Sequence, residues 1–196
     1  MPGENCGRHR VIGYDNKVSN NPYKKISSRL VYENPWMKLR EDAVTRPNGN
    51  PGIFGTVEIG PGASVLAIDR EKNIYLVREW KYPLARYTLE VISGGKDGEE
   101  TFEQCARREL EEEAGLTGGT LMALGLMETI TTIVKSQVQL FLATDVEPGV
   151  VIPGDDDIME VVKMPFAEAL EKAMSAEFEH AATVITILKA ARLLGY

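Results

Sequence analysis

An acidic segment between Gly94 and Leu116 carries the residues best suited to chemistry, reading GGKDGEETFEQCARRELEEEAGL. Residues Thr101–Ala114 are predicted to form a helix, because Thr101 with Gln104 three residues later gives a capping box. Gly115, followed by a leucine, is typical of a helix C-terminus. The glutamates of this segment therefore occupy defined positions on a helix surface.

A helical wheel shows which way these glutamates point. With a step of about 100° per residue, Cys105 and Ala106 lie near Phe102 and form the expected apolar stripe. Glu109 and Glu113 fall on the same side as Phe102. Two carboxylates thus continue the face that should be buried.

Burying ionised carboxylates without a partner is costly, and like charges one helical turn apart increase that cost. A divalent cation is the simplest compensation, because Glu109, Glu112 and Glu113 together present a hard oxygen cluster that suits Mg²⁺ or Mn²⁺. The alternative is a solvated run of charges balanced by Arg107 and Arg108.

The full spacing decides between these interpretations. It is Gly, five residues, Glu, seven residues, and then Arg-Glu-Leu-x-Glu-Glu-x-Gly-Leu. This pattern resembles the Nudix box at every fixed position: Gly94, Glu100, Arg108, Glu109, Leu110, Glu112, Glu113, Gly115 and Leu116. So many specified positions in so short a segment make a chance match very improbable.

The resemblance to the Nudix family implies roles for individual residues. Glu109 and Glu113 would be the principal ligands of Mg²⁺, or of Mn²⁺, with Glu112 beside them and the carbonyl oxygen of Ser93 completing the coordination. Glu112 and Arg108 would also belong to the catalytic machinery, with Arg108 pairing with the box carboxylates. Metal ions that bridge a diphosphate neutralise its charge and activate an attacking water.

The residues before the box are similar to those of one branch of the family, the ADP-ribose and nucleotide-sugar pyrophosphatases. The similarity lies in residues 74–83 and 89–94. It implies substrate-binding roles for Lys81 and Glu90.

Two departures from that branch broaden the expected substrate. Ile92-Ser93 stands where the branch has Pro-Ala, and Thr131-Thr132-Ile133 occupies the region where ADP-ribose enzymes often have a proline. We therefore expect nucleoside-diphosphate sugars in general, with ADP-ribose as one of them.

The N-terminal residues are also similar to those of this branch. In its members, an N-terminal strand domain exchanges with a partner subunit and helps to form the nucleotide pocket. Residues 28–59 would be this region in a homodimer, and Arg40 and Arg46 would contact substrate. Trp36 or Trp80 could stack on a base, which is worth about 1–3 kcal/mol. Alternatively, each tryptophan is a core or dimer-interface residue.

A general base is expected outside the box, because the box glutamates bind metal. In the resembling branch a loop supplies an acidic residue, and the corresponding loop here is acidic, with Asp156 as the candidate and Asp155 and Asp157 as its neighbours. An acidic surface turn is the alternative. Glu160 is the reserve candidate.

Composition restricts the class of protein. The chain has 196 residues, of which 43% are hydrophobic, enough for a buried core. A net charge of −7 disfavours a nucleic-acid binder, and no apolar run of about 18 residues predicts a membrane span. Cys6 and Cys105 are too few and too distant for a disulfide framework, and residues 1–21 lack the apolar core of a signal peptide. We therefore expect a cytoplasmic protein.

The order of predicted elements gives the fold class. Strands are expected at 30–32, 37–44, 54–59, 64–68, 74–78, 87–92, 121–129, 138–144 and 158–164, and two helices at 166–174 and 181–194. Residues 93–95 are expected to break a strand. This order favours an α+β domain, a Nudix-type α/β/α sandwich with a mixed central sheet, plus a small N-terminal antiparallel strand region. The expected division is an N-terminal arm at 1–27, the strand region at 28–59 and the Nudix domain at 60–196.

The sequence thus predicts Mg²⁺-dependent hydrolysis of a nucleoside-diphosphate sugar or ADP-ribose to a nucleoside monophosphate and a sugar phosphate. One alternative keeps this chemistry and changes the substrate to nucleoside triphosphates, dinucleoside polyphosphates or NADH. A second is a non-catalytic nucleotide-sensing module, which would predict an eroded box, whereas this box is intact.

Overall fold

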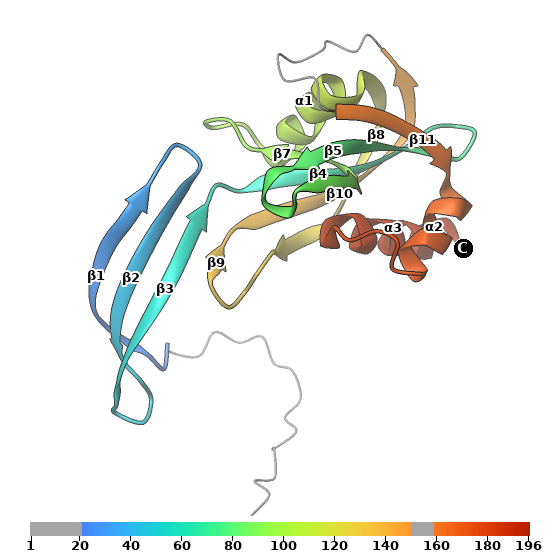
Figure 1. Cartoon of the computed structure of the whole chain (residues 1–196). Helices are drawn as coiled ribbons and strands as arrows, with labels where there is room; N and C mark the ends of the chain where they lie inside the picture. Colours follow the sequence, from blue (N-terminus) through green and yellow to red (C-terminus); the bar gives the residue numbers. More distant parts are fainter. Residues whose placement is uncertain (1–20, 150–158) are drawn as a thin grey trace, which may run out of the picture.

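Strand pairing divides the chain into two sheets in the computed structural model, which describes residues 21–149 and 159–196 (Figure 1). The N-terminal sheet has the order β1-β2-β3-β9. Its strands are β1 (Lys24–Glu33), β2 (Met37–Thr45), β3 (Pro51–Ile59) and the short β9 (Val134–Lys135). The first three are antiparallel to one another, and β9 runs parallel to β3.

The central sheet has the order β11-β5-β4-β10-β8, with β6 paired to β5 and β7 paired to β4. Its strands are β4 (Gly62–Ile68), β5 (Asn73–Lys81), β6 (Arg86–Glu90), β7 (Ile92–Gly95), β8 (Leu116–Glu128), β10 (Gln137–Pro148) and β11 (Met159–Pro165). A 3₁₀ turn, η1 (Tyr82–Leu84), joins β5 to β6. Because β10 is parallel to β4 while the other pairs are antiparallel, the sheet is mixed, as predicted.

Helices cover both faces of the central sheet (Figure 1). α1 (Phe102–Ala114) packs on one face, and α2 (Phe166–Met174) and α3 (Ala181–Leu194) pack on the other. Alternation along β4 directs Val65 toward α1 and Leu66 toward α2 and α3. The predicted α/β/α sandwich is confirmed. Within the described residues, no helix is long and apolar enough to cross a membrane.

The N-terminal sheet projects from this sandwich (Figure 1). Every residue of β1 is exposed. The strand begins at Lys24 and is far longer than the predicted strand at 30–32. Its length follows from a ladder with β2 that runs from Lys24 opposite Thr45 to Glu33 opposite Lys38. Residues 24–27, expected in the N-terminal arm, therefore lie in this sheet.

The predicted strand break at residues 93–95 is wrong. Gly94 and Gly95 pair with β4 as part of β7, and the interruption falls at Val91, between β6 and β7. The amide of Val91 donates a hydrogen bond to the side chain of Thr183 (2.9 Å). A contact with a residue so distant in the sequence leaves no local signal.

The turn between β4 and β5 is built around one carboxylate. Asp69 accepts hydrogen bonds from the amides of Glu71 (3.0 Å) and Asn73 (2.8 Å) and pairs with Lys163 on β11 (2.8 Å). Tyr75 also donates its hydroxyl hydrogen to Asp69 (3.3 Å). Burial alone would raise the pKa of Asp69, but the hydrogen bonds from Lys163 and Asn73 outweigh it and bring the pKa to about 2.

We predict that Asp69→Ala lowers the free energy of unfolding by about 2–3 kcal/mol, because it leaves buried donors unpaired. Glu71→Gln is the control, since Glu71 is exposed and lies 3.6 Å from the same lysine. Because the folded pKa is depressed below 3.8, the contribution of Asp69 is complete above about pH 4 and is lost as the pH falls toward 2. Urea unfolding of both variants at pH 7 and pH 3 measures this, and equal stabilities at pH 7 would contradict it.

Candidate active site

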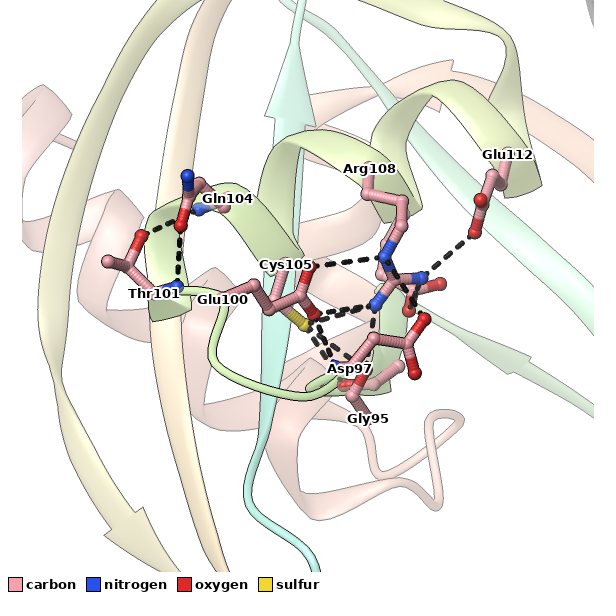
Figure 2. Close-up of polar contacts among 10 residues, drawn as sticks. Gly95, Asp97, Glu100, Thr101, Gln104, Cys105, Arg108 and Glu112 are labelled. Atoms are coloured by element: carbon pink, nitrogen blue, oxygen red, sulfur yellow. Dashed lines mark hydrogen bonds and ion pairs between the residues drawn. The ribbon is translucent and has the colours of Figure 1, made fainter.

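The loop between β7 and α1 is shaped to bring backbone and helix close together. Thr101 caps α1 and forms the predicted capping box with Gln104 (Figure 2). Gly94 lies directly against Glu109, since a Cβ at position 94 would stand 1.8 Å from the carboxylate oxygen Oε1 of Glu109. Only a glycine at this position leaves room for the carboxylate.

Arg108 is the centre of the polar contacts in this region (Figure 2). Its guanidinium donates hydrogen bonds to Glu100 (2.9 Å), Glu109 (2.7 Å) and Glu112 (2.9 Å) and to the carbonyl oxygen of Gly95 (2.7 Å). The predicted pairing of Arg108 with box carboxylates is therefore present in the structure. A single side chain joins the loop to three carboxylates and holds them in place.

The wheel prediction of buried carboxylates agrees with the structure for Glu109, whereas Glu113 is half-buried. Glu109 is only 6% exposed, and burial raises its pKa although Arg108 opposes the shift. Burial also raises the pKa of Glu113 to about 8, against a hydrogen bond from the amide of Ser93 (3.0 Å). Glu112, by contrast, is exposed. α1 thus carries two carboxylates whose charges the surrounding protein does not fully compensate.

These residues suit a hard divalent cation by the chemistry of their donors. In the described part of the chain, however, no three His, Cys, Asp or Glu side chains stand together ready to hold a metal ion. Glu109 and Glu112 are turned to Arg108, and Glu113 is turned to Ser93. Coordination would require these side chains to exchange present partners for the cation.

A second charged group lies on β5 and β6. Lys81 forms a short ion pair with Glu79 and a longer one with Glu90 (3.4 Å), and Glu90 is only 8% exposed. Burial would lower the pKa of Lys81, but its pairing with Glu79 and Glu90 raises it. The charges of Glu79 and Lys81 also act on the pKa of Glu113. The two sequence-predicted residues Lys81 and Glu90 therefore meet, and they lie near the box.

Sequence reasoning missed Glu79. Its position two residues before Lys81 could have indicated that the two side chains meet, because alternate residues of a strand share a face. Its separation from the box in the sequence hid this connection.

Trp80 lies on the opposite face of β5 from Lys81. It packs edge-on against Tyr87 (5.2 Å between ring centroids), and Arg78 lies 4.0 Å above the same ring. Glu160, the reserve candidate for the base, pairs with Arg78 (3.0 Å) and so belongs to this group. A role for Trp80 at the substrate stays a prediction. Asp156, the first candidate base, lies outside the described residues.

The candidate residues of the N-terminal sheet are spread along β2. Trp36 is 77% exposed at one end and lines a groove of about 470 Å³ whose other walls include Lys38, Glu58, Pro61, Lys135 and Gln137. Arg40 lies 3.9 Å from Glu58. Arg46 lies beyond the other end of β2 and packs against Gly52. At about 3.3 Å per residue, Trp36 and Arg46 of one chain are about 30 Å apart, so they do not line one pocket.

Comparison with known families agrees with this architecture. The Nudix domain profile matches residues 58–184, and that of the nucleoside diphosphate sugar hydrolase N-terminal domain matches residues 23–57. The chain therefore belongs to the Nudix family. Within the family, it falls in the branch of ADP-ribose and nucleoside-diphosphate-sugar pyrophosphatases, and it is an enzyme, a Nudix pyrophosphatase.

Individual relatives resemble the chain over most of its length. An ADP-ribose pyrophosphatase of Bacillus subtilis is 28% identical, covering 84% of this chain and 90% of the relative. An ADP-sugar pyrophosphatase of Mus musculus is 28% identical over 77% of this chain and 78% of its own. A GDP-mannose pyrophosphatase of Cronobacter sakazakii is 30% identical over 65% and 72%. A solved structure described as an ADP compounds hydrolase has a TM-score of 0.80 at 19% identity, covering 91% of this chain and 97% of its own, and shows the shared fold.

We predict that Gly94→Ala slows hydrolysis by about a hundredfold, because the new methyl group displaces the Glu109 carboxylate by an ångström or more. The free energy of unfolding should change little, since the displaced atoms are the end of a side chain. Gly95→Ala is the matched control, as a Cβ there meets nothing within 4 Å. Steady-state rates and thermal unfolding of both variants provide the test. Similar rates for the two would contradict the tight packing of Glu109.

Proposed function

We propose that the chain hydrolyses the diphosphate linkage of nucleoside-diphosphate sugars or ADP-ribose in the presence of Mg²⁺, releasing a nucleoside monophosphate and a sugar phosphate. The observation that carries this proposal is the pair Glu109 and Glu113, two incompletely compensated carboxylates beside Arg108. The names of the relatives, which cover ADP-ribose, ADP-sugars and GDP-mannose, support the substrate class.

The residues that would hold Mg²⁺ are Glu109, Glu112 and Glu113, with the carbonyl oxygen of Ser93. Bound there, Mg²⁺ would neutralise the diphosphate and make an attacking water more acidic. Arg108 holds the helix carboxylates in position beside the loop through its hydrogen bonds to Glu109 and Glu112.

Substrate contacts come from two regions in this proposal. The ammonium of Lys81 supplies positive charge for a phosphate, and Glu90 holds that ammonium in place. Trp36 offers an exposed indole face for a base, which fits the groove that it lines. Arg40, Arg46 and Trp80 are the remaining candidates. Because the N-terminal sheet projects from the sandwich (Figure 1), we propose that Arg40 and Arg46 act on a partner subunit.

Asp156 remains our candidate for the general base. Its support is the register of β11, in which Met159 stands opposite Glu79. β11 begins three residues after Asp156 in the sequence, beside the strand that carries Glu79 and Lys81.

A substrate panel with Mg²⁺ tests the function, with phosphate measured after phosphatase treatment. ADP-ribose and nucleoside-diphosphate sugars should be cleaved, and Glu113→Gln should lose several orders of magnitude in rate while remaining folded, since glutamine still accepts the hydrogen bond of Ser93. Glu111→Gln, an exposed position on the same helix, is the control and should keep full activity. If the enzyme cleaves nucleoside triphosphates, dinucleoside polyphosphates or NADH but neither ADP-ribose nor nucleoside-diphosphate sugars, the proposed substrate class is wrong. Normal turnover by Glu113→Gln would refute the metal assignment.

We also infer a homodimer, in which the N-terminal sheet packs on a partner subunit. β1 is an edge strand exposed on both faces, and exposed apolar side chains gather on this sheet, among them Ile26, Leu30, Val31, Tyr32, Ile53 and Phe54. Such a strand is normally covered, because its unpaired backbone and apolar surface promote association. The cytoplasmic location expected from the two cysteines stays a prediction.

Sedimentation velocity at low micromolar concentration tests the dimer. The wild-type protein should have an apparent mass of about twice the 21.7 kDa of one chain. Leu30→Asp should shift it toward the monomer, because the carboxylate would have to be buried at the interface. Met174→Asp is the control, an exposed apolar residue of the sandwich (70% exposed). A wild-type monomer would exclude the shared pocket.

A further inference from the structure

A histidine contacts the Glu90 carboxylate in addition to Lys81. His180 immediately precedes α3, and its Nδ1 atom lies 3.4 Å from the Oε2 atom of Glu90. The other carboxylate oxygen of Glu90 accepts a hydrogen bond from the hydroxyl of Thr88 (2.7 Å). Lys81 lies 3.4 Å from Oε2 as well, so the histidine and the lysine share one oxygen atom.

The same turn of α3 fixes the backbone next to Glu90. Thr183 is fully buried, and its hydroxyl oxygen lies 3.0 Å from Nδ1 of His180 and accepts the hydrogen bond of the Val91 amide. Since both Glu90 and Thr183 offer oxygen lone pairs to Nδ1, the tautomer with hydrogen on Nδ1 fits this environment. One helical turn thus determines both where the strand is interrupted and where the Glu90 carboxylate points.

We propose that His180 is a positioning residue, which orients Glu90 and through it holds the Lys81 ammonium toward the diphosphate of the substrate. The inference rests on the proposed function. His180 does not touch the box, and its side chain makes no cap to α3, so its contacts serve Glu90 and Thr183.

The electrostatic surroundings favour a neutral imidazole in this role. Burial lowers the pKa of His180, Glu90 raises it and Lys81 lowers it, and the net shift is downward from 6.5. With a neutral imidazole, Lys81 is the positive charge that pairs with the Glu90 carboxylate. A protonated imidazole would compete with Lys81 for this carboxylate. The other charged groups nearby are Glu79, which pairs with Lys81, and Glu179, which pairs with Arg86 (2.8 Å).

Kinetics of three variants provide the first test. His180→Ala should raise the KM for a nucleoside-diphosphate sugar about fivefold, as expected for the loss of one ordinary hydrogen bond, and change kcat less than twofold. His180→Asn should restore the KM to within about twofold, because the asparagine amide nitrogen takes the position of Nδ1. In a Lys81→Met background, His180→Ala should have no further effect on KM, since the two act as a unit. Additive effects, or no rescue by asparagine, would overturn the proposal.

Proton NMR provides a second test that needs no substrate. The chain has two histidines, His9 and His180, so His9→Gln assigns both ring signals. His180 should titrate below its ordinary range, lower still in Glu90→Gln and higher in Lys81→Met. A titration unaffected by either substitution would exclude the contact, even if His180→Ala lost activity by unfolding. If nucleotide sugars are not cleaved at all, the substrate assignment fails, and the titration alone decides whether His180, Glu90 and Lys81 are linked.

Discussion

Two carboxylates withdrawn from water beside the central sheet, the buried Glu109 and the half-buried Glu113, are the constraint on which the rest of the site depends. α1 packs on the sheet through small and apolar side chains, and the same face carries these two acids. The cost of withdrawing a charge from water is several kcal/mol unless the charge is paired. The glycine at position 94 makes room for one carboxylate, the Ser93 amide supports the other, and Arg108 spans the gap to the loop. The local fold is therefore organised around acids that only a cation would fully compensate.

The period of two along β5 separates two environments that lie next to each other in the sequence. Glu79 and Lys81 share the face on which the box lies, whereas Arg78 and Trp80 share the other face with Tyr87. The polar face carries charge pairs and is suited to an anionic ligand. The aromatic face instead forms a compact cluster with its own cation–π contact. Consecutive residues of this strand therefore face different surroundings.

Features with a local signal could be predicted from the sequence. The ends of α1, α2 and α3 agree with the capping and periodicity signals, and the burial of Glu109 follows from the wheel. Features set by distant partners could not. The interruption at Val91 depends on Thr183, the length of β1 depends on β2, and β9 is too short for any periodicity. The ion pair between Lys81 and Glu79, by contrast, had a local signal, because residues two apart on a strand share a face. Asp156 lies outside the described residues.

The balance of charge in the site indicates how an anionic substrate could be accepted by an acidic protein. Seven carboxylates surround two basic side chains, Lys81 and Arg108: those of Glu79, Glu90, Asp97, Glu100, Glu109, Glu112 and Glu113. Both basic side chains already form ion pairs in the structure, so Lys81 alone would neutralise only part of the charge of a diphosphate. An incoming diphosphate would meet further negative charge at close range, where the repulsion is screened less than in water. Divalent cations that arrive with the substrate would reverse the sign of this field. Binding of the proposed substrate would therefore depend on the same cations that we propose for its hydrolysis.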